Sequence, residues 1–152
     1  MSFATLLSSE VIAIAPPWRT FAETTAGLVE RMVGTGLLPA DRQGDVCAAI
    51  ARREAEGSTA VLEIGIGLPH ARVAGLTGPL AALALAPGGL YEAVPMVRIR
   101  IVALLVSSAS ATEAHLKLLA GVATTLRSPL LRATLLEAPT PAAALAVLRQ
   151  HG

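Results

Sequence analysis

The segment AVLEIGIGLPHAR (residues 60–72) contains the pattern that decides the fold. Its apolar run over residues 60–68 predicts a buried β-strand. Pro69 fixes its own φ angle and favours extended backbone at the residue before it. We therefore expect the strand to end near Pro69 and His70 to lead the loop that follows.

His70 is one of three histidines, and its neighbours make it a candidate reactive group. Gly65 and Gly67 lack side chains where another group must approach the backbone closely. A neutral imidazole in such a place is a usable nucleophile or base near pH 7. The alternative is that the Pro-His pair forms an ordinary turn with a half-exposed ring.

Outward from this segment, three further strands are predicted. They are residues 11–15, which are stopped by a Pro-Pro pair, residues 80–86, and residues 97–106. In the last of these, apolar residues alternate with Arg98 and Arg100 before the run becomes fully apolar, so one face is expected to contact water at its start.

Five helices are predicted from their end signals. The first is opened by Thr20 with Glu23 in a capping-box pattern and is followed by Gly34 and Gly36. The predicted helices start after the N-cap residues Thr20, Ser110, Ser128 and Thr140 and near Ala40, and they end near Gly34, Glu56, Leu126, Glu137 and Gln150. The order is strand, two helices, three strands, three helices. Segregated strands favour a layered α+β domain, and residues 1–152 are expected to form a single domain.

Composition narrows the classes of function. The chain has 152 residues, of which 53% are hydrophobic and 3% aromatic, with a net charge of +1. Its basic residues are scattered, which argues against a nucleic-acid surface. The single cysteine, Cys47, excludes an intramolecular disulfide and fits a reducing compartment, so a cytoplasmic location is expected. The start of the chain does not have the shape of a signal peptide.

The mean hydropathy of +0.62 raises the question of a membrane span. The longest apolar-looking stretch, residues 74–90, holds four glycines and two prolines and is a poor spanning helix. A sheet buried between helix layers explains the hydropathy better, and no direct membrane insertion is expected. The apolar content also favours a homodimer through Leu and Ala faces of the terminal helices.

Two further residues are candidates for an anion site. Arg53 ends the second helix, and arginine suits multi-donor recognition of phosphate oxygens, although it also complements a helix C-terminus. His115 lies in the first turn of a helix, where free N–H groups favour anions, although it also suits a ring that packs beside the helix. No metal-ligand spacing is present, and no cofactor is expected.

Three segments carry a resemblance: RREAEGST (residues 52–59), GIGLPH (65–70) and HLKLLA (115–120). In this order and spacing they resemble the IIA domain of the fructose/mannitol/nitrogen class of the bacterial sugar phosphotransferase system. The resemblance implies an α/β/α three-layer sandwich with a four- or five-stranded mixed sheet flanked by helices.

The same resemblance implies a function. His70 would accept a phosphoryl group from an HPr-like phosphocarrier and pass it to a IIB-type domain. His115 would lie beside it and orient the phosphoryl group, and Arg53 would help to hold its charge. These implied roles are consistent with the requirements of phosphoryl transfer, which needs mainly positioning and electrostatic stabilisation.

Departures from the family pattern leave two alternatives open. Gly67 stands where alanine is usual, and the last strand ends in Ser107-Ser108 rather than in proline followed by an acidic residue. These changes affect the expected docking surface more than His70. One alternative is a regulatory, nitrogen-type or transporter-associated module of the same fold. The other is a structural domain that has lost the relay.

Overall fold

The structure is a computed structural model that describes residues 2–151. Its helices are α1 (Phe3–Leu6), α2 (Phe21–Gly34), α3 (Gln43–Ala55), α4 (Thr112–Leu126), α5 (Pro129–Glu137) and α6 (Pro141–His151). Its strands are β1 (Ile12–Ile14), β2 (Ala60–Val61), β3 (Ile66–Gly67), β4 (His70–Val73), β5 (Leu80–Leu85), β6 (Tyr91–Val94), β7 (Val97–Ile99) and β8 (Ile101–Ser108).

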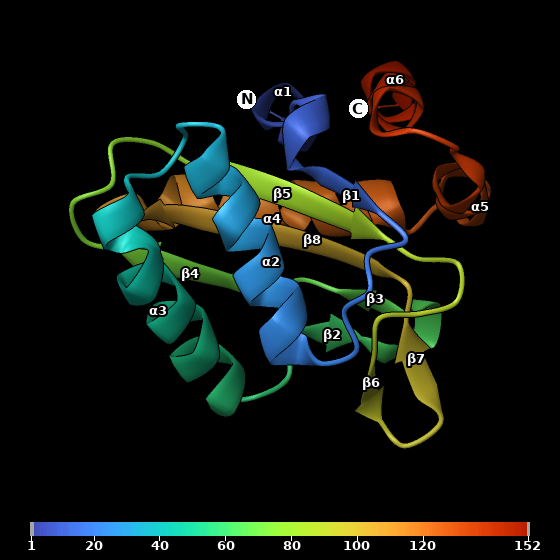
Figure 1. The fold of residues 1–152 in the computed structure, drawn as a ribbon, viewed down its shortest axis with the longest axis horizontal. Coiled ribbons are helices and arrows are strands. Elements are labelled where there is room, and N and C mark those ends of the chain that lie inside the picture. Colours follow the sequence, from blue (N-terminus) through green and yellow to red (C-terminus); the bar gives the residue numbers. More distant parts are fainter. Residues whose placement is uncertain (1, 152) are drawn as a thin grey trace.

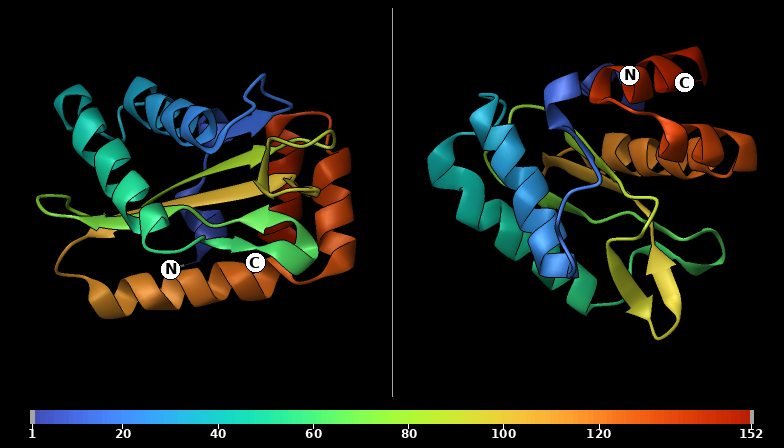
Figure 2. Two further views of the ribbon diagram at one scale, coloured as in Figure 1. Left: turned by 90° about the horizontal axis from the view of Figure 1, so that it is seen from below. Right: turned by 45° about the vertical axis from the view of Figure 1, so that its right-hand side comes forward.

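The helices lie on both faces of a central sheet. α2 and α3 cover one face and α4 covers the other, as the left view of Figure 2 shows from below. The two ends of the chain come together, because α1 packs against α6, which in turn packs against β1 (Figure 1). The α/β/α three-layer sandwich expected from the sequence is confirmed.

The sheet has six strands, more than the four or five expected. Its order is β1-β5-β8-β3-β2, and β4 also pairs with β8. β8 runs antiparallel to β5 and parallel to β3 and β4, so the sheet is mixed. Residues 101–107 of β8 are buried. The core is almost entirely Ala, Leu, Val and Ile, as the scarcity of aromatic residues predicts.

The prediction that His70 leads a loop is wrong, because His70 is the first residue of β4. The chain does not turn away at Pro69. Ile66 lies opposite Ile101 and His70 lies opposite Leu105, which is the same register on both sides of the proline. A proline removes one ladder donor but its φ angle is compatible with extended backbone, so the chain continues along β8.

Two predicted strands are broken in the structure. Residues 60–68 are interrupted by a short 3-10 turn that ends at Gly65, whose φ of +66° favours glycine. Residues 97–106 divide at Arg100, so that β7 forms a separate hairpin with β6 while β8 enters the main sheet. Both breaks accompany local hairpins, in which β2 pairs with β3 and β6 pairs with β7, and the periodicity of apolar residues alone does not reveal these hairpins.

Three of the four predicted side-chain caps are confirmed. The hydroxyl groups of Thr20, Ser128 and Thr140 each accept a backbone N–H three residues later. Ser110 does not cap α4, because its hydroxyl pairs with that of Ser108 and Ala111 takes the N-cap position.

The second half of the capping box in α2 is shifted by one residue. The carboxylate of Glu23 accepts the N–H of Arg19 at 2.7 Å, rather than the N–H of Thr20. The predicted helix near Ala40 begins as a 3-10 turn over Ala40–Arg42 and becomes α-helical at Gln43.

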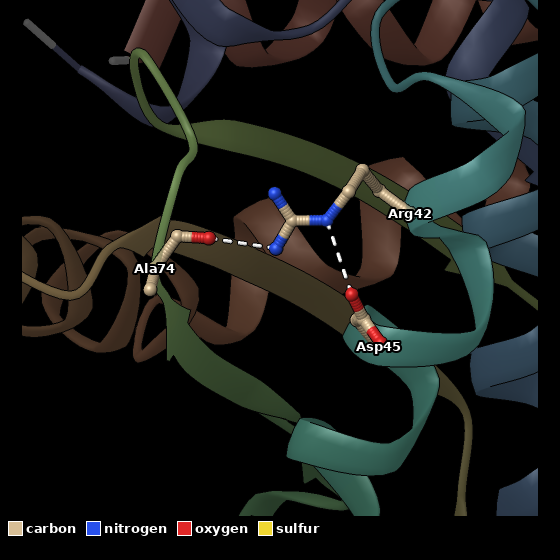
Figure 3. A network of polar contacts seen from close by, with 3 residues as sticks. All are labelled: Arg42, Asp45 and Ala74. Carbon is tan, nitrogen blue, oxygen red and sulfur yellow. Dashed lines mark hydrogen bonds and ion pairs between the residues drawn. The ribbon is translucent and has the colours of Figure 1, made fainter.

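Arg42 ties the start of α3 to the end of β4. Its Nη2 donates to the carbonyl oxygen of Ala74 at 2.6 Å, and its Nε pairs with the carboxylate of Asp45 at 3.2 Å (Figure 3). Because α3 carries Arg53 and β4 carries His70, this network helps to fix the relative position of the two elements that supply those side chains.

The effects on stability of substitutions at Gly67 and Tyr91 are expected to be coupled. A Cβ atom added at Gly67 would collide with the Tyr91 hydroxyl. Gly67→Ala should therefore lower the free energy of unfolding by roughly 1–3 kcal/mol, and Tyr91→Phe in the same chain should recover most of that loss. Urea denaturation of the two single variants and the double variant measures this coupling.

Gly121→Ala is the matched control for that cycle, because no heavy atom outside its chain neighbours and the backbone of its own helix lies within 4 Å of the added Cβ. It should be neutral or slightly stabilising, since alanine is the better helix former. An equal cost of Gly67→Ala with and without the Tyr91 hydroxyl would show that the hydroxyl is not the obstacle.

Candidate functional site

The His70 ring is held by the backbone two residues before it. Its Nδ1 lies 2.7 Å from the carbonyl oxygen of Leu68. A carbonyl oxygen only accepts hydrogen bonds, so Nδ1 must donate and carry the proton. The Nε2 atom of the neutral ring is therefore left with its lone pair. The extended backbone at Leu68, which Pro69 favours, helps to place that carbonyl.

His115 lies beside His70. It is the fourth residue of α4, and its ring centroid is 5.4 Å from that of His70, with the two rings inclined by 50°. The residue is only 4% exposed, and its Nδ1 is 2.8 Å from the hydroxyl oxygen of Ser107 at the end of β8.

The two rings line one cavity of about 430 Å³ between α3, β4 and α4. Five of its ten lining residues are arginines or histidines, namely Arg52, Arg53, Arg72, His70 and His115. The single acidic residue that lines it is Glu56. An excess of guanidinium groups around paired imidazoles suits an anion with several oxygen atoms.

Arg53 is oriented by the loop after its own helix. Its Nη1 donates to the carbonyl oxygen of Gly57 at 3.0 Å. The next residue, Glu54, is occupied elsewhere, because its carboxylate accepts the hydroxyl of Thr59 at 2.5 Å. Arg53 thus contributes positive charge to the cavity while its neighbouring carboxylate is engaged with the loop.

Arg72 is a site residue that the sequence did not single out. Its Nη1 donates to the carbonyl oxygen of Ala109 at 3.0 Å and to the hydroxyl of Thr112, and so it joins β4 to the start of α4. Alternation along a strand was the available signal, because His70 and Arg72 lie two residues apart on one face. The expectation of a loop at His70 hid that alternation.

Both rings are held in the neutral form near pH 7. The pKa of His70 is lowered overall: burial and the charge of Arg53 lower it, while the Leu68 hydrogen bond and the charge of Glu54 oppose them. Burial, followed by repulsion from His70 when that ring is protonated and from the charge of Arg72, lowers the pKa of His115 from 6.5 to about 4. A neutral imidazole has a free lone pair, which a nucleophile requires.

Protonation of His115 is expected to weaken the fold in acid. Between its folded pKa of about 4 and its unfolded pKa of 6.5, the unfolded chain binds more protons. The stabilisation is therefore complete above about pH 6.5 and is lost as the pH falls through about 4. His115→Gln, which cannot titrate, should flatten this part of the profile of unfolding free energy measured by urea denaturation.

His151→Gln serves as the control for this measurement, because His151 is exposed at the end of α6. Its profile should follow that of the unmodified protein. Parallel profiles for the unmodified protein and His115→Gln would contradict the assignment of the acid transition to His115.

Within residues 2–151, no group of three or more His, Cys, Asp or Glu residues is placed to hold a metal ion. None of the helices described is long and apolar enough to cross a membrane.

Solved structures share the fold. The fold matches the nitrogen regulatory protein IIA-Ntr from Neisseria meningitidis with a TM-score of 0.81 and 20% identity, over 95% of this chain and 97% of that one. It also matches a chain in the complex of enzyme IIAMTL and phosphorylated enzyme IIBMTL from Escherichia coli, with a TM-score of 0.76 and 17% identity, over 95% of this chain and 97% of that one. The architecture is that of the IIA proteins.

The sequence then places the chain in a family. The family model for the phosphoenolpyruvate-dependent sugar phosphotransferase system, EIIA 2, matches residues 5–151, and the chain belongs to this family. It is thus a phosphotransferase component, as the three motifs predicted.

A longer relative agrees with this assignment. The fructose-specific EIIABC component of the phosphotransferase system of Bacillus subtilis (strain 168) is 32% identical over 104 residues. Those residues are 68% of this chain and 16% of that protein, so the chain matches a small part of its relative.

Proposed function

We propose that His70 is the phosphoryl carrier of a relay, accepting the group at Nε2 from an HPr-like phosphocarrier and passing it to a IIB-type domain. The observation that carries this proposal is the pairing of His70 Nδ1 with the Leu68 carbonyl, which leaves Nε2 as the free nucleophilic atom beside a cavity rich in arginine. Family membership supports the same reading.

In the first step the Nε2 lone pair attacks phosphorus, and the bond from phosphorus to the donor breaks with its electron pair leaving on the donor. No proton has to move at His70, because Nδ1 already donates to Leu68. The product is a phosphorylated ring that keeps its Nδ1 proton and gains a positive charge, because the Nε2 lone pair now forms the bond to phosphorus. A cationic ring is a good leaving group, so the second transfer can follow the same path in reverse.

The surrounding cations would act on the charge that develops during transfer. Arg53 and Arg72 line the cavity with His70, and the ring of His115 lies within reach of a group bonded to it. Preorganised donors of this kind stabilise a transferring phosphoryl group without reorganising during the reaction.

The experiment that tests the proposal is incubation with a radiolabelled, phosphorylated HPr-like carrier, followed by addition of a IIB-type domain. We expect the chain to acquire an acid-labile label and to lose it to the acceptor. The solved complex of enzyme IIAMTL with phosphorylated enzyme IIBMTL motivates the choice of acceptor. Failure of every carrier from the same cell to label the chain would favour the regulatory module instead.

Three finer expectations accompany the relay. The chain would act as a single domain in the cytoplasm, where its lone Cys47 would remain reduced. A homodimer through the terminal helices would cover Leu130 of α5, which is 72% exposed.

A further inference from the structure

We infer that Ser107 sets the tautomer of His115, so that the two neighbouring histidines present opposite chemistry at Nε2: a lone pair on His70 and a hydrogen-bond donor on His115. This inference concerns Ser107 as a positioning residue, and its role in transfer rests on the proposed function.

The geometry begins with a buried polar pair. Ser107 is 2% exposed and His115 is 4% exposed, and the Ser107 hydroxyl oxygen lies 2.8 Å from Nδ1 of His115. Within residues 2–151, this ring nitrogen is the only hydrogen-bond partner of the Ser107 side chain. A buried hydroxyl that does not donate its proton loses a hydrogen bond that water would otherwise supply. The hydroxyl should therefore donate to Nδ1.

The direction of that hydrogen bond decides which nitrogen of the His115 ring carries the proton. A neutral imidazole carries one proton, and a nitrogen that accepts cannot carry it. Nδ1 of His115 is thus the unprotonated atom, and the proton lies on Nε2. Since His115 also lines the cavity, its remaining polar atom is an N–H donor for an anion there.

His70 has the opposite arrangement for the same reason. Its Nδ1 faces the Leu68 carbonyl, which can only accept, so its proton is on Nδ1 and its Nε2 is unprotonated. A serine hydroxyl and a backbone carbonyl therefore give different tautomers to two rings whose centroids are 5.4 Å apart. When a phosphoryl group is bonded to His70, its oxygen atoms can accept the Nε2–H of His115.

The first test is the tautomer itself, read by long-range proton–nitrogen NMR correlation on the unmodified chain at neutral pH. We expect a protonated Nε2 on His115 and a protonated Nδ1 on His70. A protonated Nδ1 on His115 would overturn the inference, whatever the outcome of phosphoryl transfer.

The second test uses variants. Ser107→Ala removes the donor, so His115 should lose its uniform Nε2–H form and transfer from labelled His70 to a IIB-type domain should slow about 10-fold. Ser107→Thr keeps the hydroxyl and should restore both the Nε2–H form of His115 and the rate of transfer. Ser108→Ala is the matched control, because the hydroxyl of Ser108 pairs with Ser110 rather than with a ring.

The outcomes separate the two proposals. Unchanged tautomer and unchanged transfer in Ser107→Ala would refute a positioning role for Ser107. Absence of any labelling of the unmodified chain would refute the proposed function, while the NMR result would still decide the tautomers. If Ser107→Ala fails to fold, the unmodified spectrum and Ser107→Thr decide the question.

Discussion

Replacing His70 with alanine is expected to abolish labelling by a phosphorylated carrier. The reason is chemical, because the variant loses the one ring nitrogen that the structure leaves unprotonated beside the arginine-lined cavity. The nitrogen that remains in the cavity, Nε2 of His115, is expected to carry a proton and to lack a lone pair. The measurement is acid-labile label retained by the chain after separation from the carrier.

The matched control removes a different histidine. His151→Ala lies at the exposed end of α6 and should be labelled like the unmodified chain. Label retained by the His70 variant would place the nucleophile on another residue, and mapping that label would identify it.

Replacing Arg53 with alanine should slow labelling and onward transfer by roughly 10- to 100-fold. A charge-assisted hydrogen bond to a phosphoryl oxygen is typically worth about 1.5–3 kcal/mol. Arg53 lines the cavity with His70, and its charge already lowers the pKa of that ring. Arg53→Lys should recover only part of the rate, because an ammonium group lacks the planar pair of donors. Single-turnover transfer, followed by loss of label from the carrier, gives the rates.

Arg149→Ala is the control for a general change in charge. Arg149 is exposed on α6 and does not line the histidine cavity. Its removal should leave both transfer rates unchanged. Equal slowing in the two arginine variants would mean that net charge guides the carrier and that Arg53 makes no special contact.

The helices could be predicted from the sequence because their ends are coded locally. Thr20, Ser128 and Thr140 each reach a backbone group only three residues away, so a short pattern is sufficient. Ser110 shows where this reasoning fails, since a competing hydroxyl at Ser108 binds it instead. The β6–β7 hairpin and the division at Arg100 were not predicted, because alternation of apolar and polar residues indicates a strand but not the strand with which it pairs.

The candidate site was predicted through its motifs, and its supporting contacts were not. His70, His115 and Arg53 line one cavity, although they come from a strand and two helices far apart in the chain. Ser107 was noted only as a departure from a pattern. Its contact with His115 joins the end of β8 to the first turn of α4, and only the folded chain brings these two positions together.

The shared register of β3 and β4 along β8 constrains how this gene segment can change in length. Leu68 and Pro69 form a two-residue joint between strands that keep one alignment on β8. One inserted or deleted codon there would turn His70 toward the opposite face of the sheet and take Nε2 away from the cavity. Surface loops commonly accept such indels, whereas this joint should accept substitutions only.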